Sequence, residues 1–187
     1  MYCAQSLRSA TSTKEKFQRL AGSYYGLILG DPPTFDNTGF VLLKLSTAAK
    51  FKGKLTMGGV PSAFSGQFDF GGHATPTVER NGLSPVVLNL HLDPGGSEQI
   101  TGTASGSAPS FTSDLLANRS VFGKTSAPPL AGHRFTALLP ANTNAPSLTP
   151  QGDGYGLVTI DPAGKVKLTG ATGDGQNDFE FTSATDV

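Results

Sequence analysis

Hydrophobic and polar residues alternate with a period of two along much of the chain, which is the pattern of half-buried β-strands. From Val86 onward, Val86, Leu88, Leu90 and Leu92 alternate with Val87, Asn89, His91 and Asp93. The same alternation predicts strands at residues 50–57, 64–70, 100–105, 165–169 and 178–182. Further strands are expected at Tyr24–Leu29, Val41–Leu45, Thr75–Arg80, Arg134–Leu139 and Tyr155–Ile160. The alternating phenylalanines, Phe51, Phe64, Phe68, Phe70, Phe179 and Phe181, are expected in the core.

Turn-forming residues separate these strands. Asn81-Gly82 tolerates the positive φ angles of a tight hairpin. The runs Asp93–Gly96 and Asp161–Gly164 each offer Asp to accept turn hydrogen bonds, Pro to preset φ and Gly for a left-handed position. Consecutive strands joined by such turns form an antiparallel meander.

One short helix is expected near the N-terminus. Ser12-Thr13-Lys14-Glu15 fits a capping box, and Phe17 and Leu20 form a short apolar stripe before Gly22. Two stretches are predicted to be loops because of their composition, residues 105–129 and 140–154. Within the first loop, Asp114–Asn118 is expected to form at most one helical turn.

The hairpins resemble one another in sequence. The segment Leu88–Gly102 aligns without a gap on Gly156–Gly170, and Val41–Gly53 is a weaker copy. Leu20-Ala21-Gly22 also matches Leu130-Ala131-Gly132. These matches indicate a repeated antiparallel hairpin, although all hairpins share some turn chemistry.

The expected fold is therefore all-β. It is an antiparallel up-and-down barrel, or a barrel-like sandwich, of about ten or more strands with a short N-terminal helix. Residues 1–21 are expected to form an N-terminal segment with that helix. Residues 22–187 are expected to form a single β domain of repeated hairpins, with possible sub-units at 22–129 and 130–187.

Three runs carry a family resemblance: Ala21–Leu27, Phe51–Leu55 and Gly152–Gly170. They resemble the Gly-rich β-repeat modules of large exported proteins of environmental bacteria. The resemblance rests on turn and strand residues. It implies an exported β-protein and supplies no catalytic residues.

The composition of the chain excludes several classes of binding partner. The chain has 187 residues, and its 14 Lys and Arg balance its 14 Asp and Glu. Zero net charge argues against duplex nucleic acid as a partner and against a polybasic membrane patch. Apolar runs fall far short of the roughly 20 residues of a membrane helix, so no membrane span is expected. Cys3 is the only cysteine, which excludes an internal disulfide.

Localisation is expected to be extracellular or at the cell surface. This follows from the resemblance alone, since the first residues carry no basic segment followed by an apolar stretch and so show no signal peptide.

Motifs of catalysis and of phosphate binding are missing from the sequence. There is no Gly-x-Ser-x-Gly and no Gly-x-x-x-x-Gly-Lys-[Ser/Thr]. Asp174–Asp178 approaches a calcium loop, but Phe179 stands where that loop needs Gly. A polar turn is the simpler interpretation, and no metal and no cofactor are expected.

Two groups of side chains are the remaining site candidates. If the protein is an enzyme, His91, Asp93 and His133 are the expected catalytic residues, because His91 and Asp93 share one strand face. Tyr24, Tyr25 and Tyr155 are the expected ligand-binding residues, on an exposed face where rings can stack on a sugar or another flat ligand. Lys50, Lys52 and Lys54 share one strand face and are expected to be solvated.

The function favoured by these observations is a non-catalytic exported or cell-surface β module for ligand binding or structural display. Its partner would be a small molecule, a glycan or a protein. The alternatives are a small hydrolase or metal-assisted enzyme with its site at a barrel mouth, and a carrier of a small apolar ligand inside the barrel.

Overall fold

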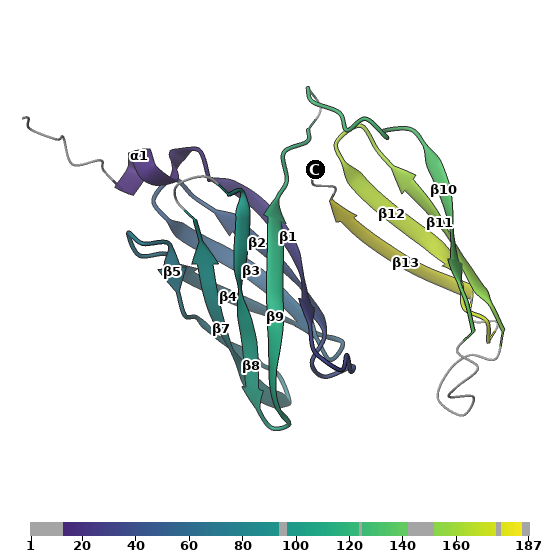
Figure 1. Ribbon diagram of the computed structural model, residues 1–187, viewed down its shortest axis with the longest axis horizontal. Helices are drawn as coiled ribbons and strands as arrows, with labels where there is room; N and C mark the ends of the chain where they lie inside the picture. Colours follow the sequence, from purple (N-terminus) through teal and green to yellow (C-terminus); the bar gives the residue numbers. More distant parts are fainter. Residues whose placement is uncertain (1–12, 94–96, 124, 142–151, 175–176, 185–187) are drawn as a thin grey trace, which may run out of the picture. The chain divides into compact units, whose positions relative to one another are not determined.

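The computed structural model describes residues 13–93, 97–123, 125–141, 152–174 and 177–184. Antiparallel strands dominate it, as the alternation predicts. The chain divides into two compact units, Met1–Arg119 and Ser120–Val187, which we call the first and second units (Figure 1). This division differs from the expected single domain over residues 22–187. The boundary falls at the end of a strand, about ten residues before the expected boundary.

The first unit is an up-and-down sheet that follows a short helix. Its elements are α1 Thr13–Gln18, β1 Gly22–Leu29, β2 Gly39–Leu45, β3 Lys50–Met57, β4 Val60–Gln67, β5 His73–Ala74, β6 Thr77–Arg80, β7 Leu83–Leu92, β8 Gln99–Ser107 and β9 Ser110–Arg119. Among the described residues, hydrogen bonds connect the strands in the order β4-β3-β2-β1-β9-β8-β7-β5, and β6 pairs with β7. Because β6 also lies against β4, the sheet is a nearly closed barrel.

The core fills the inside of this barrel. Alternate residues of each strand point inward, as in β2, where Val41, Leu43 and Leu45 are buried. The inner residues of β3 and β4 are complementary in size, because each large ring on one strand faces a glycine on the other. The Phe64 ring occupies the space beside Gly53, and the Phe51 ring does the same beside Gly66. Large rings facing glycines let neighbouring strands share one packed layer.

The helix α1 belongs to this core and is not a separate segment. Phe17 is fully buried and its ring stacks on Phe68, with centroids 6.5 Å apart. Leu20, just after the helix, is also buried. The short helix therefore gains its stability from packing, as a helix of this length requires. The short helix expected within residues 1–21 is present, and its apolar side chains pack into the core of the first unit.

The expected loop at residues 105–129 is wrong over its first half. Residues 110–119 form β9, which pairs with β8 on one side and β1 on the other. Ser113, Leu115 and Ala117 are buried, whereas Leu116 points outward and is 47% exposed. The predicted helical turn at Asp114–Asn118 is thus a strand, because two neighbouring strands supply backbone partners that override local composition.

The second unit is a smaller meander. Its strands are β10 Arg134–Leu139, β11 Gly154–Ile160, β12 Lys165–Ala171 and β13 Asn177–Ala184. Within the described ranges they form one antiparallel sheet in chain order. All were expected as strands from the alternation. Most of the loop expected at 140–154 lies outside the described residues.

Each unit contains a hairpin turn of the same geometry. In the β2–β3 turn, the Ser46 N–H donates to the Lys50 carbonyl at 2.8 Å and Ala49 has a φ of 61°. In the β11–β12 turn, the Asp161 N–H donates to the Lys165 carbonyl at 2.9 Å, and Gly164 has a φ of 78°. The predicted turn at Asp161–Gly164 is confirmed, as is the Asn81-Gly82 hairpin, where Gly82 has a φ of 74°. The turn expected at Asp93–Gly96 lies mostly outside the described residues.

Phe17→Ala tests whether α1 is part of the barrel core. We expect the free energy of unfolding to fall by about 3–5 kcal/mol, because a fully buried ring leaves a cavity between the helix and Phe68. Urea unfolding followed by circular dichroism measures this. The control is Phe35→Ala, which removes a ring that is 72% exposed and should change stability by less than about 0.5 kcal/mol. Equal effects of the two variants would show that the helix does not contribute to the core.

Candidate functional site

The structure separates the tyrosines that were expected to bind a ligand. Tyr24 is fully buried, so its expected place on an exposed face is wrong. Its hydroxyl donates to the Leu20 carbonyl at 2.7 Å and ties the end of the helical segment to β1. Burial raises the pKa of Tyr24 to about 12. Tyr24 is therefore a core residue of the first unit.

The other two tyrosines face outward from different units. Tyr25 is half-buried on β1, with its ring 6.4 Å from that of Phe40 on β2. Tyr155 is 58% exposed on β11 of the second unit. Tyr24 points into the core while Tyr25 points outward from the same strand, so these two tyrosines do not share one aromatic surface.

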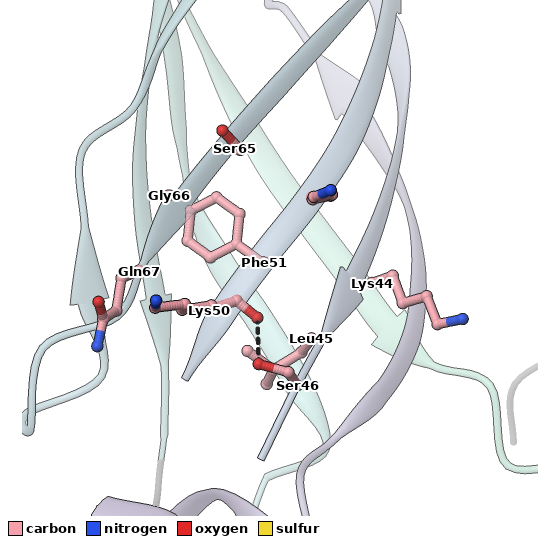
Figure 2. A pocket seen from close by; sticks show the side chains of 9 residues that line it. Lys44, Leu45, Ser46, Lys50, Phe51, Ser65, Gly66 and Gln67 are labelled. Atoms are coloured by element: carbon pink, nitrogen blue, oxygen red, sulfur yellow. Dashed lines mark hydrogen bonds between the residues drawn. The ribbon is translucent and has the colours of Figure 1, made fainter. Parts of the chain in front are cut away.

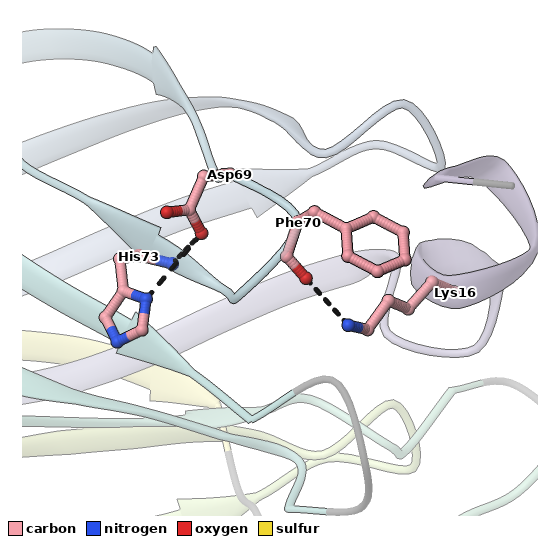
Figure 3. A network of polar contacts seen from close by, with 4 residues as sticks. All are labelled: Lys16, Asp69, Phe70 and His73. Atoms are coloured by element: carbon pink, nitrogen blue, oxygen red, sulfur yellow. Dashed lines mark hydrogen bonds and ion pairs between the residues drawn. The ribbon is translucent and has the colours of Figure 1, made fainter. Parts of the chain in front are cut away.

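The histidines are also grouped differently from the expectation. His91 on β7 pairs with His73 on β5, and the two rings stack with centroids 4.7 Å apart. Asp69 accepts a hydrogen bond from the His73 N–H at 2.8 Å, and its carboxylate lies 3.6 Å from the His73 ring nitrogen Nδ1 (Figure 3). That backbone hydrogen bond lowers the pKa of Asp69. The result is an exposed cluster that shapes the turn before β5.

Lys16 of α1 lies on the other side of the same turn. It donates to the Phe70 carbonyl at 2.7 Å and sits 3.9 Å above the centre of the Phe70 ring (Figure 3). Phe70 follows the end of β4 and is 54% exposed, so its expected place in the core is wrong. The turn at residues 68–73 thereby holds α1 by a cation–π contact and a hydrogen bond.

Of the three residues expected in a catalytic group, His91 and Asp93 belong to the first unit and His133 to the second. Asp93 follows β7 and accepts a hydrogen bond from the Ser97 N–H at 3.4 Å. His133 belongs to the second unit, where its ring stacks on Phe135 at 6.3 Å. Among the described residues, no group of three or more His, Cys, Asp and Glu side chains is placed to hold a metal ion. The calcium-like run Asp174–Asp178 includes residues outside the described ranges.

A groove lies on β2, β3 and β4 of the first unit. We call it the lysine groove; its volume is about 650 Å³ and it opens to solvent. It is lined by Lys44, Leu45, Ser46, Lys50, Phe51, Lys52, Ser65, Gly66 and Gln67 (Figure 2). The β2–β3 turn forms one end of it, where the Ser46 hydroxyl donates to the Lys50 carbonyl at 2.9 Å.

The register of the sheet concentrates positive charge in this groove. Lys44 on β2 lies directly opposite Lys52 on β3, and Lys52 lies opposite Ser65 on β4. Lys50, at the start of β3, pairs with Gln67. In Figure 2 the Lys44 and Lys50 side chains extend to opposite sides of the groove. None of the three lysines forms an ion pair with any residue in the part of the chain that the structure describes.

This arrangement carries an electrostatic cost in the absence of an anion. Like charges directly opposite each other on neighbouring strands destabilise a sheet. An anionic group bound between Lys44 and Lys52 would relieve that repulsion. The hydroxyl of Ser65 and the amide of Gln67 add neutral polar groups at the same site, beside the apolar side chains of Leu45 and Phe51.

The sequence predicts only part of this site. It places Lys50, Lys52 and Lys54 on one strand face, where they are expected to be solvated. Lys44 was missed because its position beside Lys52 depends on the pairing of β2 with β3. The tight turn at Ser46–Ala49 was the available signal, since it sets the register of that hairpin.

Comparison of the sequence with protein-family models and with curated proteins gave no match to either. Within the described ranges, no helix has the length and apolar character needed to cross a membrane.

The burial of the Tyr24 hydroxyl can be tested through the pH dependence of stability. Its pKa is raised from 10.0 to about 12 on folding, so the stability it contributes is complete below pH 10. That contribution is lost as the pH rises from 10 towards 12, because the unfolded state loses the phenolic proton first. We expect the free energy of unfolding of Tyr24→Phe to fall less than that of the wild type as the pH rises over this range. Urea unfolding at several pH values measures this. Tyr25→Phe is the control and should follow the wild type. Identical profiles for wild type and Tyr24→Phe would contradict the buried hydroxyl.

Proposed function

We propose that this chain is a non-catalytic, exported or cell-surface β module that binds acidic saccharides in the lysine groove. The observation that carries the proposal is the placement of Lys44, Lys50 and Lys52 around one open groove without an ion-pair partner among the described residues. The resemblance of the sequence to exported Gly-rich β-repeat modules supports the expected location outside the cell.

The chemistry of the lining favours a saccharide with carboxylate or sulfate groups. An ammonium group is a point charge with three donors, so it binds such groups without the fixed geometry that arginine requires. Ser65 and Gln67 can exchange hydrogen bonds with sugar hydroxyls. Since the groove is open, it suits one segment of a longer chain better than a ligand that must be enclosed.

The barrel interior supports the apolar-carrier alternative less well. Its central positions are filled by large side chains, among which Tyr24, Phe17 and Phe68 are almost completely buried. A carrier needs a cavity that encloses most of its ligand. An apolar ligand would have to displace this packed core.

The structure gives the hydrolase alternative less support, because His91 lacks the surroundings of a general base. A general base needs an orienting partner and a place for the reacting atom within hydrogen-bond reach. Within the first unit, the ring of His91 instead stacks on that of His73. This placement favours a structural role for His91 over a catalytic one.

The test is a binding comparison with matched charge changes. We expect Lys44→Ser/Lys52→Ser to weaken binding of a polyuronate oligosaccharide by about tenfold at low salt, because two ammonium contacts at an exposed site are removed. The control is Lys165→Ser/Lys167→Ser, which removes the same charge from exposed, alternate positions of β12. Isothermal titration calorimetry measures both variants and the wild type.

The control double variant should bind as the wild type does, and wild-type affinity should fall as salt is added. A neutral oligosaccharide of similar length is expected to bind poorly. Equal affinity for the neutral and acidic chains, or equal losses in the two double variants, would refute the lysine groove as the site. Circular dichroism checks that each variant is folded.

A further inference from the structure

The second unit has an apolar face that its own strands do not cover. Cross-strand pairing places Phe135, Val158 and Leu168 in one row of the sheet. On β10, β11 and β12 this face contains no charged side chain: Phe135, Ala137, Leu139, Gly154, Gly156, Val158, Ile160, Val166, Leu168 and Gly170. Phe135 and Leu139 are 40% and 39% exposed. We call these residues the inner face of the second unit.

The first unit shows what such a face packs against. The turn after β11 matches the turn after β2, and with that match Val158 and Ile160 correspond to Leu43 and Leu45. Leu43 and Leu45 are buried inside the barrel. The strands that complete that barrel are β6–β9, which form a second meander with its own inward-facing leucines. A meander of this type is therefore covered by another meander.

The free edges of the strands also favour another meander as the partner. In the first unit, β1 pairs with β9, and β4 lies against β6. The first strand of each meander thus meets the last strand of the other. In the second unit, β10 and β13 each have one hydrogen-bonded neighbour among the described residues. Their outer edges carry backbone donors and acceptors that favour strand addition.

The second unit resembles both halves of the first. Its β11–β12 hairpin matches β2–β3 through the turn, and it aligns with β7–β8 in sequence from Leu88 to Gly102. The inward positions coincide, since Leu90 aligns with Val158 and Leu92 with Ile160, and both leucines are buried. One sequence can therefore take either role in a closed barrel.

We propose that the meander β10–β13 pairs with the same meander of a second copy of this chain. A two-fold axis along the barrel would place β10 of each copy beside β13 of the other, in antiparallel order. The interface is then isologous, as closed dimers require. Both inner faces become one core and both pairs of open edges gain a partner, as β1 gains β9 between the halves of the first unit.

The test uses neighbouring residues of β10 with opposite orientations. Leu139 lies on the inner face, and Leu138 lies on the outer face and is 67% exposed. We expect the full chain to be a dimer by analytical ultracentrifugation at about 100 μM. Leu139→Lys should raise the dissociation constant by about a hundredfold or more, because it would bury an unpaired ammonium group. Leu138→Lys should leave the dissociation constant within about threefold of the wild type.

Hydrogen exchange provides a second measurement that does not depend on a variant folding well. Backbone amides of β10 and β13 should become more protected as the protein concentration rises, and amides of β1 and β9 should not change. A wild-type chain that stays monomeric at this concentration would overturn the proposal. So would a dimer that Leu139→Lys and Leu138→Lys weaken equally, or protection that does not depend on concentration.

Discussion

The pairing of β1 with β9 is the interaction on which the first unit depends. It joins Tyr24 to Arg119 and Leu29 to Asp114, and so connects the two ends of a long meander. The strands come close at Gly26, where a Cβ atom would lie 2.3 Å from the Leu116 carbonyl oxygen. A larger residue would force β1 and β9 apart. Because this pairing brings both halves of the barrel together, the burial of nearly every core residue follows from it.

Most of the strands could be predicted because their alternation is a local property. Hairpin turns such as Asn81-Gly82 are also local, since glycine relieves the backbone at positive φ. The strand β9 could not be predicted this way. Leu115 and Leu116 are adjacent, and only the neighbouring strands decide that Leu115 turns inward and Leu116 outward.

The same ambiguity explains why the sequence does not predict that Tyr24 faces the core. In β1 the two alternating sets, Tyr24 with Ile28 and Tyr25 with Leu27, are both apolar. The sequence alone therefore does not say which set faces the core, and a one-residue change of register would exchange them. The hydrogen bond from the Tyr24 hydroxyl to the Leu20 carbonyl satisfies the buried phenol, which makes the inward orientation possible.

The candidate site depends on register in a further way. A lysine row along β3 is visible in the sequence, but the sequence does not reveal which residues of β2 and β4 flank it. Pairing brings Lys44 beside Lys52 and places Ser65 next in the row, which turns a charged strand into a groove with mixed chemistry. Partner residues from separate strands are a property of the sheet, so sequence reasoning could identify the lysines and could not assemble the site.

The two units also differ in a way that repetition alone does not explain. Position for position, the first unit has Val41 and Leu55 where the second has Gly156 and Gly170, and Gly53 where the second has Leu168. The apolar bulk has moved between strands, but each face remains uncharged. A Cβ at Gly156 would lie 2.4 Å from the Leu168 side chain, so these changes compensate one another within the sheet. Such compensation preserves an inner face that packs as a layer, which is what a meander needs if another meander is to cover it.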